Sequence, residues 1–221
     1  MLLSVEKRSK LDESDDFDFY DYPRFVNHVD DAFIMQLTEL YRRYLTPQAR
    51  IFDMMSSWVS HLPPEMEFAE VVGHGMNEEE LARNPRLDRY FRQNLNQKQL
   101  LPLEGDYFDA VLNTVSVQYL QYPEAVFAEI WRILKPGGVA IVSFSNRMFY
   151  QKAIQAWRDG SDGSHVQLVC KYFESVGKFE SIEVAKRTGR SLQGSTGFMS
   201  LLRPPSDPFY AIIGRKSGEL A

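Results

Sequence analysis

Residues 139–144 most strongly constrain what this chain can fold into. The run Val-Ala-Ile-Val-Ser-Phe is almost wholly apolar and does not alternate apolar with polar positions. Such a strand is buried on both faces, as in a parallel sheet covered by helices. The segment before it, Pro123 to Leu134, repeats apolar residues at helical spacing. Lys135, Pro136 and two glycines are expected to end that helix and turn the chain. Together they predict an α/β fold.

The rest of the chain alternates the same two kinds of element. The expected strands are Arg50–Met55, Phe68–His74, Tyr90–Phe91, Phe108–Asn113, Val139–Phe144, Phe179–Val184 and Pro208–Ile213. The expected helices are Ala32–Leu45 (capped by Asp30 or Asp31), a brief one over Ser56–His61, one over Asn77–Ala82 with Asn77 as its cap, Pro123–Leu134, Met148–Asp159 and His165–Val176. This alternation predicts a doubly wound sheet in one domain, 1–221, with a long loop over 186–206.

Composition narrows the class of protein. A chain of 221 residues suits one large domain, and its formal net charge of −5 argues against a nucleic-acid partner. No apolar run approaches the roughly 18 residues that a membrane span needs, and the N-terminus has no hydrophobic signal core. The single cysteine, Cys170, excludes a disulfide within the chain and reads as a core thiol. The sequence therefore predicts a cytoplasmic protein without a membrane partner.

Residues 1–29 form an arm in which carboxylates alternate with aromatic side chains, as in the segment from Asp15 to Tyr22. Two interpretations stay open. The favoured one is a solvated, partly flexible arm. In the other, Phe19, Tyr20 and Tyr22 fold over a pocket while the acids face water.

Two linked motifs carry a resemblance to a known family. The first, residues 101–111, reads LPLEGDYFDAV, and the second, residues 129–138, reads EIWRILKPGG. At this separation they resemble the class I methyltransferases that act on small molecules with S-adenosylmethionine. The resemblance implies a Rossmann-like, seven-stranded sheet whose last strand is antiparallel, with the cofactor over the first two strands. These motif residues mostly build the fold.

The positions at which that family holds its cofactor are altered here. Asp53 matches the acid after the first strand, but Ser56 and Ser57 stand where the family has glycines. Gly75 replaces the carboxylate that accepts the ribose hydroxyls, and Asn94 replaces the acid that receives the adenine amino group. The residues expected to bind the cofactor end or follow the first four strands: Asp53, Ser56, Ser57, His74, Asn77, Asn94, Leu95 and Asn113.

Three functional hypotheses fit this pattern. The first is a methyltransferase that acts on a small-molecule substrate, and the second is a methyltransferase-fold protein that has lost the cofactor and serves as a binding or scaffold module. The third, weaker one keeps the crevice for another ligand. His28 suits a general base or a packing role, so no catalytic residue is singled out. No histidines at helical i, i+4 spacing and no Cys-x-x-Cys occur, so no metal site is predicted.

Overall fold

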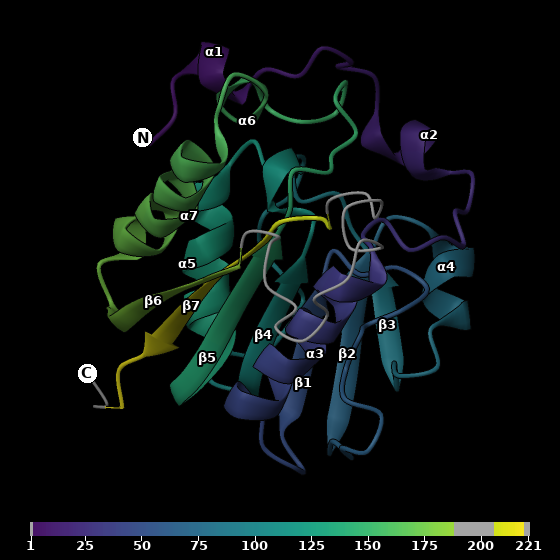
Figure 1. Cartoon of the computed structure of the whole chain (residues 1–221), viewed down its shortest axis with the longest axis vertical. Coiled ribbons are helices and arrows are strands. Elements are labelled where there is room, and N and C mark those ends of the chain that lie inside the picture. The colour runs from purple at the N-terminus through teal and green to yellow at the C-terminus, as the bar shows by residue number, and fades with distance from the viewer. Residues whose placement is uncertain (1, 188–205, 219–221) are drawn as a thin grey trace, which may run out of the picture.

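The chain folds around a seven-stranded sheet with the strand order β3-β2-β1-β4-β5-β7-β6 (Figure 1). This computed structural model describes residues 2–187 and 206–218. The strands are β1 Arg50–Met54, β2 Glu70–Gly75, β3 Arg89–Arg92, β4 Phe108–Thr114, β5 Leu134–Phe144, β6 Phe179–Arg187 and β7 Phe209–Lys216. The first five run parallel, and β7 runs antiparallel to both of its neighbours. The predicted α/β sheet with an antiparallel last strand is confirmed.

Helices cover both faces of the sheet and create two apolar cores. On one face, α3 (Asp31–Tyr44) packs Phe33 and Leu37 against Ile51 of β1 and Ile141 of β5. On the other, α5 (Pro123–Ile133) and α7 (Asp162–Val176) pack against the sheet around Phe127. Figure 1 shows α3 in front of the sheet and α5 and α7 behind it. Because β5 lies between these cores, its apolar run needs no alternation.

Helix α5 passes directly into β5, earlier than predicted. Strand pairing begins at Leu134, which lies opposite Phe108 of β4 before a register shift. Gly137 takes a positive φ of 78°, and a Cβ at Gly138 would lie 2.8 Å from the Lys135 carbonyl oxygen. The two glycines therefore turn the chain as predicted, but within an irregular strand rather than before it.

One predicted helix is absent, and another is shorter than predicted. Residues 56–61 form a loop, because the hydroxyls of Ser56 and Ser60 bond to Asp53 instead of capping a helix. Only α6 (Gln155–Arg158) remains of the helix predicted over 148–159, because tertiary contacts hold the residues before it. Lys152, for example, is fully buried and donates to the Ser14 carbonyl oxygen. The loop predicted over 186–206 starts later, since β6 includes Lys186 and Arg187, and residues 188–205 lie outside the described part of the chain.

The N-terminal segment, residues 2–29, lies across the carboxyl ends of the strands (Figure 1, top). It contains α1 (Val5–Arg8) and α2 (Asp16–Tyr20). Arg8 donates to the Gln121 carbonyl oxygen and to Glu124, and Lys10 forms a buried ion pair with Asp16. The favoured prediction of a solvated arm is therefore wrong. The covering interpretation holds for Tyr20, which lines the cavity, but Tyr22 is exposed and the acid Asp16 is buried instead of facing water.

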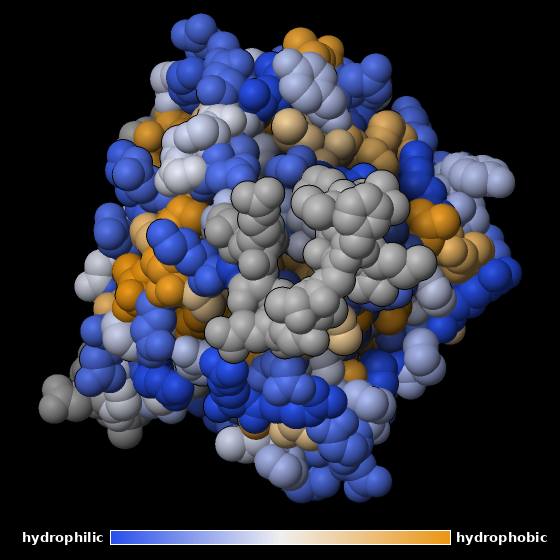
Figure 2. Space-filling model, in the orientation of Figure 1, coloured by the Kyte–Doolittle hydropathy of each residue, from blue (hydrophilic) through white to orange (hydrophobic). Residues whose placement is uncertain are grey.

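The outer surface carries both hydrophilic and apolar side chains. Figure 2 shows a face that is mostly hydrophilic outside its grey part, with several separate apolar areas. No helix among residues 2–187 and 206–218 combines the length and apolarity needed to cross a bilayer.

Candidate functional site

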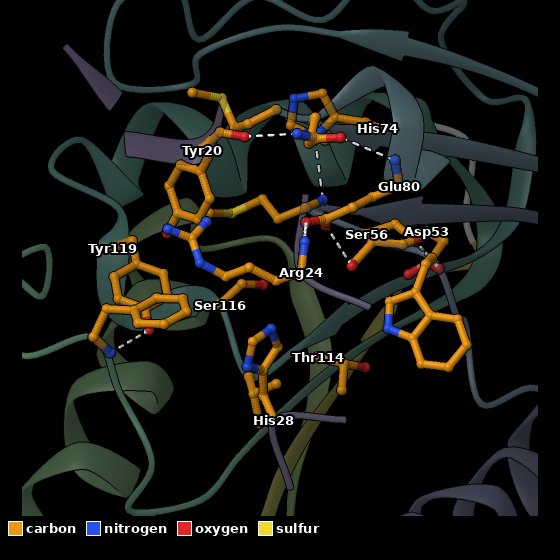
Figure 3. A pocket seen from close by; sticks show the side chains of 18 of the residues that line it. Tyr20, Arg24, His28, Asp53, Ser56, His74, Glu80, Thr114, Ser116 and Tyr119 are labelled. Atoms are coloured by element: carbon orange, nitrogen blue, oxygen red, sulfur yellow. Dashed lines mark hydrogen bonds between the residues drawn. The ribbon is translucent and has the colours of Figure 1, made fainter. Parts of the chain in front are cut away.

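A cavity of about 340 Å³ lies where the carboxyl ends of β1 to β4 meet beneath the N-terminal segment. In a doubly wound sheet this edge is the ligand crevice. Figure 3 shows Tyr20 and Tyr119 on one side of the cavity and Asp53 and Ser56 on the other. Seven of the eight residues expected at a cofactor site line it, namely Asp53, Ser56, Ser57, His74, Asn77, Asn94 and Leu95. Asn113 is buried just beneath and is not part of the lining.

Asp53 organises the loop that follows β1. Its Oδ2 accepts hydrogen bonds from the hydroxyls of Ser56 and Ser60, each at 2.6 Å. Asn84, at the end of α4 (Glu78–Arg83), donates to Ser60 Oγ at 2.8 Å and to the Ser57 carbonyl oxygen at 2.9 Å. Burial raises the pKa of Asp53 to about 6, although both hydroxyl bonds act in the opposite direction. The loop is thus held by its own side chains.

His74 joins the ends of β1 and β3. Its Nδ1 accepts the backbone N–H of Met55 at 3.1 Å, so Nε2 carries the proton and donates to the Gln93 carbonyl oxygen at 2.9 Å. Burial lowers the pKa of His74 to about 4, which keeps the ring neutral. Both ring nitrogens are therefore occupied, and His74 presents the cavity with ring carbon rather than with a donor or acceptor.

Position 75 cannot carry a side chain in this loop arrangement. A Cβ built on Gly75 would lie 2.6 Å from the Ser56 carbonyl oxygen. The Ser56 N–H in turn donates to the His74 carbonyl oxygen at 2.7 Å, which fixes the path of the loop. The glycine is thus matched to the serine loop, and the space beside it is filled by backbone.

A third group of polar contacts ties the N-terminal segment to α4. Asn77 caps the helix through Glu80 N–H, and its amide donates to the carbonyl oxygens of Tyr20 and Asp21 at 2.8 Å. Glu80 accepts the Arg24 N–H and the Ser57 hydroxyl, both at 2.6 Å. Glu80 is the last of three consecutive acids, and no sequence pattern distinguishes it as the one that turns inward.

The residues after β3 and β4 form a wall of the cavity in which a buried polar group lacks a hydrogen-bond partner. The Asn94 side chain accepts the Asn96 N–H at 2.9 Å, and Leu95 packs beside it. Ser116, which precedes the short helix η1 (Val117–Tyr119), is 7% exposed, and its buried hydroxyl has no partner. Val115, just before it, has a φ of 44°, which is strained for a β-branched residue. Met55 and His61 also line the cavity with positive φ, so three strained residues meet here.

Aromatic side chains form the roof of the cavity. The Arg24 guanidinium lies 4.8 Å from the ring centre of Phe19 and 5.4 Å from that of Phe149. His28 meets Phe149 edge-on at 5.4 Å, and partial burial lowers the pKa of His28, so its ring is neutral at pH 7. Phe149 N–H donates to the Tyr119 hydroxyl at 2.8 Å. Within the described residues no group of three or more His, Cys, Asp or Glu side chains is arranged to hold a metal ion.

Comparison with known proteins finds one family model that matches part of the chain. Residues 58–142 match the family model described as a methyltransferase domain. No curated protein sequence matches the chain.

Three solved structures illustrate the likeness of fold. One is a chain of the Haloferax volcanii complex between the Trm112 methyltransferase activator and a proposed methyltransferase, with 14% identity over 86% of this chain and 92% of that one and a TM-score of 0.59. The [4+2]-cyclase SpnF has 15% identity over 83% and 82% of the two chains, with a TM-score of 0.58. The Haemonchus contortus phosphoethanolamine N-methyltransferase 2, solved with S-adenosyl-L-methionine, has 14% identity over 83% and 52%, with a TM-score of 0.56.

Proposed function

We propose that this chain, which carries a class I methyltransferase domain, binds S-adenosylmethionine in the cavity above β1 to β4 and methylates a small molecule. The observation that carries the proposal is the cavity itself, at the carboxyl ends of β1 to β4. Its volume of about 340 Å³ falls in the range of small-molecule sites, about 300–1,000 Å³.

The residues of the cavity fit a nucleoside cofactor in part. Leu95 offers an apolar wall for a flat base, and Asn94 lies beside it with an amide that can exchange its local hydrogen bond for one to the base. The space beside Gly75 does not fit the usual ribose carboxylate, because the Ser56 carbonyl oxygen fills it. Glu80, like Asp16 and Asp53, is a buried acid that lines the same cavity.

The other side of the cavity suits the methyl acceptor. Tyr20, Tyr119 and Phe149 supply apolar surface, and the unpartnered Ser116 hydroxyl offers a hydrogen bond in a buried place. The N-terminal segment covers this side, which favours a small molecule over a macromolecule. S-adenosylmethionine supplies an electrophilic methyl group on a sulfonium. The chain's part is to align the acceptor and exclude water, and the neutral His28 ring at the cavity edge is placed to take up a proton.

Ligand-dependent unfolding tests this proposal. S-adenosylmethionine or S-adenosylhomocysteine at about 100 times its dissociation constant is expected to stabilise the chain by about 2.7 kcal/mol. Adenosine triphosphate, which shares the nucleoside but differs at the 5′ substituent, serves as the comparison ligand. Absence of any stabilisation by millimolar S-adenosylhomocysteine contradicts the proposal.

A second function, a binding or scaffold module that has lost the cofactor, is favoured by one specific observation. Met55 and Trp58 line the cavity, and Trp58 donates to the Val26 carbonyl oxygen. These bulky side chains flank Ser56 and Ser57, which stand where the family has glycines. The likeness to SpnF, described as a cyclase, shows that this fold also occurs outside methyl transfer. Binding of S-adenosylhomocysteine rejects this second function.

We further propose a cytoplasmic location, which Cys170 supports as the single cysteine.

A further inference from the structure

Glu80 is a buried carboxylate in the first turn of α4 that accepts hydrogen bonds from neutral groups. The residue is 8% exposed and lines the cavity. Its two hydrogen bonds come from neutral groups, the Arg24 N–H and the Ser57 hydroxyl, and no lysine or arginine of the described residues forms an ion pair with it. The neighbouring acid Glu79 differs, because it is exposed and pairs with Arg83.

The remaining capacity of Glu80 points to a ligand with hydroxyl or amine donors. An ionised carboxylate accepts about four hydrogen bonds, and Glu80 accepts two. A buried charge is costly unless further donors satisfy it. Since the carboxylate faces the cavity, those donors belong to whatever the cavity holds (Figure 3).

Position 75 explains why the acid comes from α4. The Ser56 carbonyl oxygen, 2.6 Å from where a Cβ on Gly75 would lie, excludes any side chain at the end of β2. The same loop places the Ser57 hydroxyl against Glu80. The loop after β1 therefore excludes a carboxylate at position 75 and orients the carboxylate of Glu80 toward the cavity.

We propose that Glu80 accepts the hydrogen bonds of the two ribose hydroxyls of the nucleoside cofactor, in place of an acid at position 75. This inference rests on the proposed function. Glu80 links the N-terminal segment to the loop after β1, and this structural role alone requires no contact with a ligand. The proposal adds such a contact. A vicinal diol offers two donors, which matches the two acceptor positions that Glu80 has left.

Calorimetry with ligands that differ only in the diol tests the assignment. Wild type, Glu80→Gln and the control Glu79→Gln are titrated with S-adenosylhomocysteine, adenosine and 2′,3′-dideoxyadenosine. Glu80→Gln is expected to weaken S-adenosylhomocysteine and adenosine by about ten- to a hundredfold and to leave dideoxyadenosine within about twofold. Glu79→Gln is expected to bind all three like wild type.

Each contrary result has a distinct meaning. Wild-type binding of S-adenosylhomocysteine that Glu80→Gln leaves unchanged overturns the role of Glu80 and spares the proposed function. Equal weakening of all three ligands also overturns it, because Glu80 would then only position the N-terminal segment. No binding by wild type overturns both proposals. If Glu80→Gln does not fold, wild type alone decides, since equal affinity for adenosine and dideoxyadenosine contradicts a carboxylate on the diol.

Discussion

Two neighbouring residues at the carboxyl edge of the sheet have pKa values shifted by the same cause in opposite directions. Asp53 at the end of β1 and His74 in β2 are both buried, and burial disfavours the charged form of each. The pKa of Asp53 therefore rises to about 6 while that of His74 falls to about 4. Between pH 4 and pH 6 both side chains are therefore neutral in the fold. Each of them makes its own contribution to the pH dependence of stability in acidic solution.

Asp53 is expected to make the fold less stable as the pH rises. Its pKa is 3.8 ordinarily and about 6 in the fold, so the folded chain holds the proton more tightly. The stability that this proton confers is fully present below pH 3.8 and is lost by pH 6, a change of about 3 kcal/mol. Denaturant unfolding of wild type and Asp53→Asn between pH 4 and 7 checks this. Wild type should lose stability relative to the variant, and a constant difference contradicts the buried acid.

His74 is expected to act in the opposite sense. Its pKa is 6.5 ordinarily and about 4 in the fold, so stability is present above pH 6.5 and is lost as the pH falls toward 4, by about 3 kcal/mol. In His74→Gln, whose amide can still donate to the Gln93 carbonyl oxygen, this dependence should vanish. NMR titration of the ring provides a direct check, and a ring that protonates near pH 6.5 argues against the buried bridge.

Gly75 is expected to tolerate no side chain. Gly75→Ala places a methyl group against the Ser56 carbonyl oxygen and should destabilise the fold by about 1–3 kcal/mol. Gly163→Ala in α7 is the matched control, because a Cβ there would lie 4.0 Å from the Ser161 hydroxyl oxygen and alanine favours a helix. Chemical denaturation measures both variants. Equal stability of Gly75→Ala and wild type means that the loop after β1 does not pass where we describe it.

At the scale of elements, the N-terminal segment depends on a buried cluster of charges. Lys152, which is fully buried, lies 3.2 Å from Asp12 and 3.4 Å from Asp16, and Asp16 also pairs with Lys10. Removing one member leaves buried charge without its partner, which destabilises more than an exposed pair does.

Lys152→Met is therefore expected to destabilise the fold by about 3 kcal/mol and to expose the N-terminal segment to trypsin. Lys7→Met is the control, since Lys7 belongs to the same segment but forms an exposed pair with Asp159. Unfolding and limited proteolysis are compared for the two variants. If both behave like wild type, the buried cluster does not hold the segment.

Sequence periodicity predicted the helices and strands that have continuous apolar faces. It failed where the hydrogen bonds of single side chains determine the local structure. Strand β5 and helices α3 and α7 follow from their patterns, and the rule for strand ends located seven of the residues that line the cavity. The loop over 56–61 was mistaken for a helix because serines that suit a cap bond to Asp53 instead. Glu80 was missed for a similar reason, since only the position of α4 decides which of three acids turns inward.

At the scale of the whole molecule, the seven-stranded sheet has its cavity at the carboxyl ends of β1 to β4. The loop after β1 is held by Asp53 and serine hydroxyls, backbone fills the place of the ribose acid, and the N-terminal segment closes the cavity. Our central claim is that this edge still binds the nucleoside cofactor.

Calorimetric titration of the full chain with S-adenosylhomocysteine tests this claim most directly. We expect one molecule to bind per chain, and competition by S-adenosylmethionine for the same site. Absence of binding heat at millimolar ligand, at two temperatures so that a chance zero enthalpy is avoided, would contradict the account.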